Sequence, residues 1–101
     1  MYTVVILPKA KDDIRQAALW YNEKQPGLGK RFVFQIRQKV EHIRQHPMAF
    51  SKRYEDVRLA VMNIFPFTIH YSVDDRVKTV LIIAVMHTSR DPKNWDRRIK
   101  E

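Results

Sequence analysis

The sequence contains no cysteine and only two glycines, and each absence excludes a class of chemistry. Without cysteine the chain has no disulfides, thiol nucleophiles or cysteine-containing zinc sites, and a reducing compartment is its natural setting. Gly27 and Gly29 fit neither of the glycine-rich patterns that cradle nucleotide phosphates. We therefore expect no redox chemistry, no cofactor and no nucleotide binding through such a loop.

Long hydrophobic runs are also missing. The longest, Val80–Met86, has seven residues, whereas crossing a bilayer takes roughly 20. The residues Met1–Pro8 lack the basic region and cleavage site of a signal peptide. These features predict a soluble cytoplasmic protein.

Positive charge is abundant and is spread over the whole chain. The 101 residues, a length typical of one domain (1–101), include 19 Lys and Arg against 11 Asp and Glu, a net charge of +8. Residues 1–50 have nine basic and four acidic side chains, and residues 51–101 have ten and seven. Such a charge attracts nucleic acid, an anionic lipid surface or an acidic protein.

Hydrophobic periodicity predicts an α+β fold with the order β-α-α-β-β-β. Thr3–Leu7 reads as a strand, and apolar residues at helical spacing follow from Pro8 to about Lys24 and from Leu28 to His46, separated by Gln25-Pro26-Gly27. Two helices joined so tightly form an antiparallel hairpin.

The period changes from 3.6 to 2 after a polar connection at 51–56. Three strands are expected, at 57–62, 65–73 and 77–87, and the last should be central because its apolar run is continuous. Pro66 lacks an N–H, so its strand should be an edge strand or bulged. We expect the helical hairpin to pack on one face of a mainly antiparallel sheet, which leaves the other face polar, cationic and open.

Three stretches resemble the ParE branch of the RelE/ParE toxins. They are Ala10-Lys-Asp-Asp-Ile-Arg with Tyr21 and Pro26-Gly-Leu-Gly-Lys-Arg-Phe32, then Phe65-Pro-Phe-Thr-Ile-His-Tyr71, then Val85-Met-His-Thr-Ser-Arg-Asp-Pro-Lys-Asn-Trp-Asp-Arg-Arg98. The resemblance implies the toxin of a type II toxin–antitoxin pair, of the plasmid-stabilisation kind, which an acidic antitoxin neutralises. It further implies that a ParE-like member poisons DNA gyrase, whereas a RelE-like member cuts mRNA on the ribosome.

A RelE-like ribonuclease is the first alternative. Metal-free RNA cleavage needs a base, an acid and cations around the phosphate. The two arginine positions of the RelE-like pattern align with Thr68 and Thr88, and no tyrosine follows Tyr71. A different catalytic set remains open, with Arg58, His87 and Arg90 as its candidates and His70 beside them.

Candidate partner contacts lie on the polar sheet face and in the carboxyl-terminal segment. Arginine and tryptophan often anchor protein interfaces, and an acidic antitoxin segment is the expected occupant. The candidates are Arg58, expected on the outward sheet face, His70, Arg90, Trp95, Arg97 and Arg98. A non-toxic nucleic-acid-binding or adaptor domain is the second alternative, although the sequence shows no RNP-type aromatic motif and no recognition helix.

Four further side chains on the helices stand out. Leu19 and Phe34 lie opposite the apolar stripes of their helices, and we expect them to pack against each other rather than to contact a partner. His42 and His46 have the i, i+4 spacing of two metal ligands but lack a third ligand nearby. A solvated helix face is favoured for this pair, and no metal ion is expected.

Overall fold

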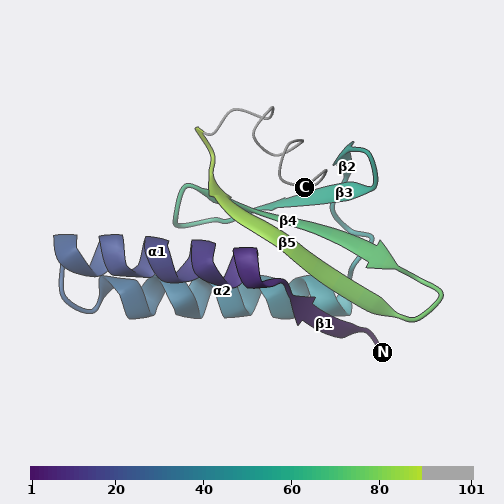
Figure 1. The fold of residues 1–101 in the computed structure, drawn as a ribbon, viewed down its shortest axis with the longest axis horizontal. Helices are drawn as coiled ribbons and strands as arrows, with labels where there is room; N and C mark the ends of the chain where they lie inside the picture. The colour runs from purple at the N-terminus through teal and green to yellow at the C-terminus, as the bar shows by residue number, and fades with distance from the viewer. Residues whose placement is uncertain (90–101) are drawn as a thin grey trace.

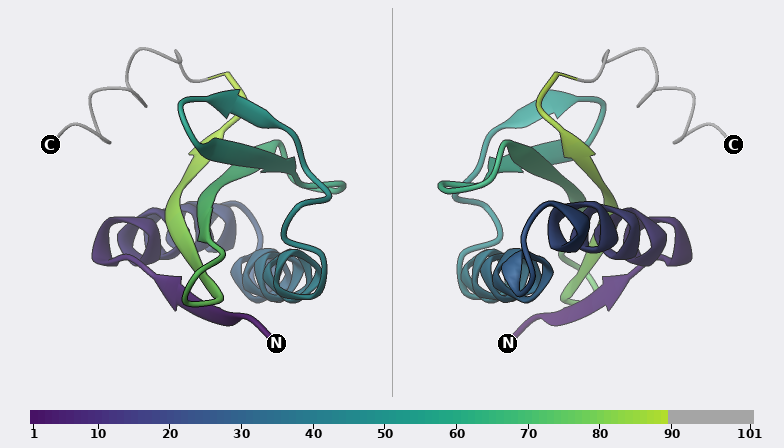
Figure 2. Two further views of the ribbon diagram at one scale, coloured as in Figure 1. Left: turned by 90° about the vertical axis from the view of Figure 1, so that its right-hand side faces the viewer. Right: turned by 90° about the vertical axis from the view of Figure 1, so that its left-hand side faces the viewer.

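The computed structural model describes residues 1–89, which form two helices and one mixed sheet of five strands (Figure 1). The helices lie side by side on one face of the sheet (Figure 2). This arrangement confirms the predicted fold class. In chain order the elements are β1 (Thr3–Ile6), α1 (Pro8–Lys24), α2 (Leu28–Gln45), β2 (Lys52–Tyr54), β3 (Val57–Val61), β4 (Phe67–Asp74) and β5 (Thr79–His87).

The strand order across the sheet is β1-β5-β4-β3-β2. β1 is parallel to β5, and all other neighbouring pairs are antiparallel. β5 thus has a neighbour on each side, as its apolar run predicts. A register shift places Tyr71 opposite Ile82 but His70 opposite Ala84. Because of this shift, Ile82 and Val85 both join the core under the helices although three positions separate them.

Two details of the sheet differ from the sequence prediction. The stretch 51–56, expected to be a connection, contains the three-residue strand β2, in which Lys52 lies opposite Arg58. So short a polar strand has no apolar alternation that a sequence pattern could reveal. The prediction that Pro66 lies within an edge strand or a bulged strand is also wrong. The proline precedes β4, and β4 lies in the middle of the sheet. Pro66 therefore removes no donor from the strand ladder.

A close contact joins the two helices near their connecting turn. Gly27 has a φ of 89°, in the left-handed region that glycine adopts readily, and its N–H donates to Asn22 Oδ1 at 2.8 Å. Two residues later, a Cβ on Gly29 would lie 2.5 Å from the backbone oxygen of Ala18. Only glycine permits this approach, so Gly29 sets how the two helices lie against each other.

Aromatic rings fill the core between the helical hairpin and the sheet. Phe32 is fully buried, and its ring centre lies 5.0–5.4 Å from those of Tyr21, Phe65 and Phe67. Tyr21 also packs on Phe65 and Phe67, at 4.9 and 6.1 Å. Aromatic pairs at such separations add to the stabilisation that burial itself provides. Burial also raises the pKa of the Tyr21 phenol above its ordinary value.

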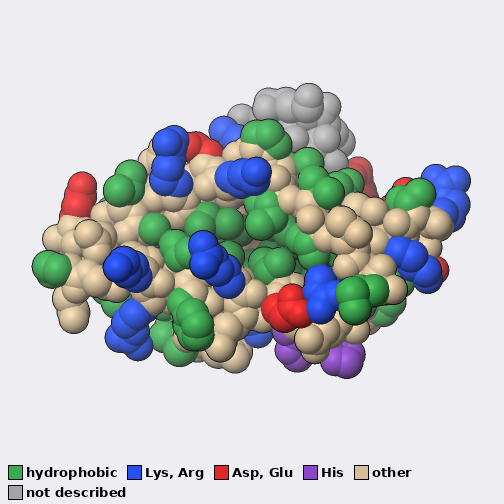
Figure 3. All heavy atoms as spheres, turned by 90° about the horizontal axis from the view of Figure 1, so that it is seen from below, with side chains coloured by type: hydrophobic (Ala, Val, Ile, Leu, Met, Phe, Trp, Pro, Cys, Tyr) green, Lys and Arg blue, Asp and Glu red, His purple; other side chains and the backbone are tan. Residues whose placement is uncertain are grey.

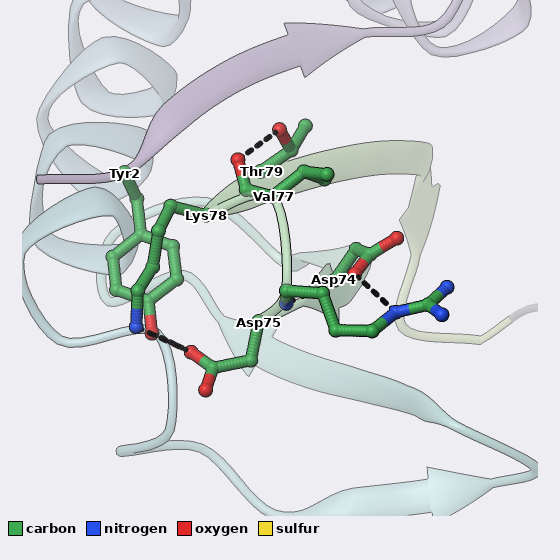
Figure 4. Close-up of polar contacts among 7 residues, drawn as sticks. Tyr2, Asp74, Asp75, Val77, Lys78 and Thr79 are labelled. Atoms are coloured by element: carbon green, nitrogen blue, oxygen red, sulfur yellow. Dashed lines mark hydrogen bonds and ion pairs between the residues drawn. The ribbon is translucent and has the colours of Figure 1, made fainter.

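A small polar cluster links the residue before β1 to the turn between β4 and β5 (Figure 4). The Tyr2 hydroxyl donates to Asp75, and Lys78 Nζ lies 3.1 Å from the same carboxylate oxygen. The Tyr2 hydrogen bond, together with Lys78, lowers the pKa of Asp75 below its ordinary 3.8. Asp75 and Lys78 are exposed to solvent and Tyr2 is only half-buried, so these polar contacts contribute little to stability.

Candidate protein-binding site

A groove of about 820 Å³ lies between α1 and α2, on the side facing away from the sheet. Viewed from this side, an apolar strip lies between basic side chains (Figure 3). The groove is lined by Arg15, Ala18, Leu19, Asn22, Gly27, Gly29, Lys30, Val33, Phe34 and Arg37.

Leu19 and Phe34 supply much of the apolar surface of this groove. Leu19 is 60% exposed and Phe34 is 56% exposed. The expectation that they cover each other is therefore wrong. Both helices turn their strongest apolar stripes toward the sheet, and the two off-stripe residues are left on the opposite surface. An apolar strip rimmed by polar residues is typical of a site that binds another molecule.

The rim of the groove is cationic. Arg15 is paired with Asp12 at 2.8 Å on the surface of α1, whereas Lys30 and Arg37 make no ion pair with any residue in the range 1–89. The helical hairpin, residues 8–45, has nine basic and four acidic side chains. A partner with acidic side chains on either side of an apolar stripe therefore matches this surface.

Only part of the groove could be recognised from the sequence pattern. Leu19 and Phe34 stood out because they leave the helical stripes, but Lys30 and Arg37 were not among the predicted contacts. Trp20, next to Leu19 in the chain, is also 54% exposed, and Lys24 Nζ lies 5.0 Å from its ring centre. The sequence signal that could have identified these residues is their common position on the helix faces opposite the apolar stripes, which a helical-wheel projection of both helices displays.

The outer face of the sheet is not the open polar surface that the sequence predicted. Ala84 and Met86 are buried there in a second apolar cluster. His70 is completely buried, with its Nδ1 3.0 Å from the hydroxyl of Tyr54. His70 was expected to offer a polar contact to a partner, but the structure places it inside the folded chain.

Arg58 lies on the face of the sheet opposite to the one expected. It stands across from Tyr71, so its side chain lies on the helix side, where it donates to the carbonyl of Phe50 at 2.6 Å. Tyr71 donates to the carbonyl of Pro47 at 2.7 Å, and burial raises the pKa of this phenol despite the nearby charge of Arg58. Arg58 and Tyr71 together hold the connection between α2 and β2.

The candidate ribonuclease residues do not converge within the described chain. His87 is exposed at the end of β5, packs on Phe67 and hydrogen-bonds Ser89 at 2.8 Å. It lies opposite Phe67, whereas Arg58 lies opposite Tyr71, which puts the two candidates about 13 Å apart along the strands. Both side chains already form hydrogen bonds within the fold, Arg58 with the backbone carbonyl of Phe50 and His87 with the side chain of Ser89.

The remaining candidates lie beyond the part of the chain that the structure describes. They are Arg90, Trp95, Arg97 and Arg98. Neither helix within residues 1–89 has the length and hydropathy that a membrane span requires.

Comparison with known proteins agrees with the arrangement of the two helices and the sheet. The chain superimposes on a chain of the chromosomal ParDE toxin–antitoxin system of P. aeruginosa with a TM-score of 0.76 and 19% identity, covering 86% of this chain and 96% of the other. The E. coli RelBE complex gives a TM-score of 0.68 at 19% identity, with coverages of 89% and 100%. The isolated E. coli RelE toxin gives 0.67 at 18%, with coverages of 99% and 97%.

At these identities the structural likeness establishes the fold. No curated protein matches the chain in sequence. The sequence profile described as the ParE toxin of the type II toxin–antitoxin system parDE, however, matches residues 4–92. The chain therefore belongs to the ParE toxin family of type II toxin–antitoxin systems.

Proposed function

We propose that this ParE-family toxin acts in the cytoplasm by binding and inhibiting DNA gyrase, and that an acidic antitoxin neutralises it. The observation that supports binding over RNA cleavage is the separation of Arg58 from His87. Cleavage requires a base, an acid and a cation within hydrogen-bond reach of one phosphate. In residues 1–89 the candidates for these roles lie on different strands and serve structural contacts.

The groove between α1 and α2 is the surface we assign to antitoxin binding. Its exposed Phe34 and Leu19 offer the large apolar contacts that dominate interface energies, and Lys30 and Arg37 offer unpaired positive charge at the rim. An amphipathic helix with an apolar stripe and acidic flanks has the complementary pattern. Binding of such a segment would bury the apolar strip and also neutralise the positive charges at the rim.

A direct comparison of the two toxin activities tests the mechanism. The purified chain is added to DNA gyrase with relaxed plasmid and ATP, and separately to translating ribosomes with a defined mRNA. We expect loss of supercoiling and intact mRNA. Cleaved mRNA with unaffected supercoiling would establish the ribonuclease instead, and no effect in either assay would favour a non-toxic adaptor.

Antitoxin binding is tested with the product of the short reading frame directly upstream, if it encodes an acidic protein. Phe34→Asp places a charge in the apolar strip, and we expect it to weaken binding at least tenfold. Val77→Asp is the matched control, because Val77 is 66% exposed in the turn between β4 and β5, away from the groove. Equal binding by the two variants would remove the groove from the proposal.

A further inference from the structure

The four histidines fall into two classes according to their contacts. His70 is buried and bonded to Tyr54, and His87 is bonded to Ser89. His42 and His46 are exposed and make no hydrogen bond or ion pair with any residue in the described range. Two of the four imidazoles are therefore committed within the fold, whereas the other two have their nitrogens available to a ligand.

The two available rings lie next to each other at the end of α2. The His46 N–H donates to the carbonyl of His42 at 2.9 Å, so the two residues stand one helical turn apart on the same face. Their ring centres are 5.4 Å apart and the ring planes make an angle of 63°. Two imidazoles on one tetrahedral zinc ion, with nitrogen–metal distances near 2.0–2.1 Å, have ring centres about 5 Å apart. The separation of the two rings is thus close to that of two imidazoles on a shared metal ion.

The surrounding structure holds this turn in place. Ile43, between the two histidines in the chain, is fully buried and fixes the helix against the sheet. The Phe50 ring lies 5.6 Å from the ring of His42, and Tyr71 holds the carbonyl of Pro47 immediately after His46. A site on a rigid helix end loses little conformational freedom when it binds a ligand.

The charges around the pair set the expected strength of binding. Arg44 is bonded through Nε to both carboxylate oxygens of Glu41, at 2.9 and 3.1 Å, so these two charges largely cancel. Lys39 lies with Nζ 5.6 Å from the Phe50 ring centre, and its charge opposes a cation nearby. No group of three metal-ligating side chains occurs among residues 1–89. The site is therefore an open, two-ligand site of moderate affinity.

We propose that His42 and His46 together bind one divalent transition-metal ion, with water in the remaining coordination positions. Imidazole ligands favour Ni²⁺, Cu²⁺ and Zn²⁺ over Mg²⁺, which prefers oxygen ligands. Bound metal links the last turn of α2 to the residue that ends it, so the ion stabilises the folded chain. The site lies outside the groove and does not depend on the proposed antitoxin contact.

Calorimetric titration of the untagged full chain with NiCl₂ and ZnCl₂ tests the proposal, with MgCl₂ as the reference ion. We expect one ion per chain and a dissociation constant on the order of 10–100 µM for Ni²⁺, a raised melting temperature, and no response to Mg²⁺. His42→Asn and His46→Asn should each weaken Ni²⁺ binding at least tenfold. His87→Asn is the matched control, an exposed histidine whose loss should leave Ni²⁺ binding unchanged.

A second measurement covers the case in which a variant folds poorly. In proton NMR spectra of the wild-type chain, Zn²⁺ should shift the ring resonances of His42 and His46 and leave those of His87 unchanged. Absence of saturable binding, unchanged binding by His42→Asn, or equal shifts at all exposed histidines would each overturn the proposal.

Discussion

The two outward faces of the molecule differ in what they expose. The sequence predicts that the outer face of the sheet is the open one, whereas in the structure the exposed apolar strip lies on the helical hairpin. The outer face of the helical hairpin keeps an apolar strip exposed, and residues 8–45 have nine basic and four acidic side chains. The outer face of the sheet buries Ala84, Met86 and His70, and residues 46–89 have five basic and four acidic side chains.

This difference separates the residues that stabilise the fold from those available to a partner. On the sheet side Ala84 and Met86 are already packed, so their contribution is to stability. Apolar side chains in the groove are exposed in the free chain, so their burial can contribute to binding. A surface with both exposed apolar groups and unpaired positive charge is the better candidate for capturing an acidic protein.

The largest expected effect is on the sheet side. Met86→Ala removes a side chain that is only 5% exposed, and we expect the free energy of unfolding to fall by about 2–4 kcal/mol in urea denaturation. Val77→Ala, at a 66% exposed position, should change it by less than about 0.5 kcal/mol. Similar values for the two variants would show that the outer sheet face is not a packed cluster.

The second prediction concerns the contact between the helices. Gly29→Ala forces a Cβ against the backbone of Ala18, so we expect a loss of about 1–3 kcal/mol in the free energy of unfolding. Gly27→Asn is the control, because asparagine tolerates the left-handed backbone and a Cβ there meets nothing within 4 Å. Thermal denaturation that ranks the two variants the other way would contradict the close approach of the helices.

The third prediction concerns the rim of the groove. The double variant Lys30→Gln and Arg37→Gln removes two charges that attract an acidic partner, so association with the antitoxin should slow on the order of tenfold at low ionic strength. The difference from wild type should shrink as salt is added, because exposed charges are screened. Arg76→Gln, in the distant β4–β5 turn, is the control, and stopped-flow fluorescence gives the rates. A slowing that salt does not change would argue against an electrostatic rim.

The smallest effect is expected at the exposed cluster of Tyr2, Asp75 and Lys78. The pKa of Asp75 is lowered, so this carboxylate contributes its stability above the unfolded value near 3.8 and loses it as the pH falls through the lower folded value. Asp75→Asn should therefore cost a little stability at neutral pH and nothing at the acid end. Melting temperatures of the wild-type chain and of Asp75→Asn, measured from neutral pH down to below 3.8, check the sign. A difference between the two that grows toward acid would contradict it.

Much of the fold could be predicted because its signals are local. Pro8 begins α1, Gly27 separates the helices, and the change from helical to alternating periodicity marks the start of the sheet. The short strand β2 escaped prediction because its pairing with β3 depends on a neighbouring backbone rather than on its own sequence. Arg58 was placed on the wrong face because simple alternation gave no sign that this half-buried arginine would hold the carbonyl of Phe50.

The sequence alone determined the order of the two helices and of every strand except β2, the excess of positive charge and the resemblance to the ParE branch, because these follow from residue types and spacings along the chain. Only the tertiary structure decided which face is open. The side of an element that solvent reaches depends on what packs against it from distant parts of the chain. Gly29 lets the two helices that line the groove approach closely, and His42 and His46 became a candidate metal site because His70 and His87 are committed to contacts within residues 1–89.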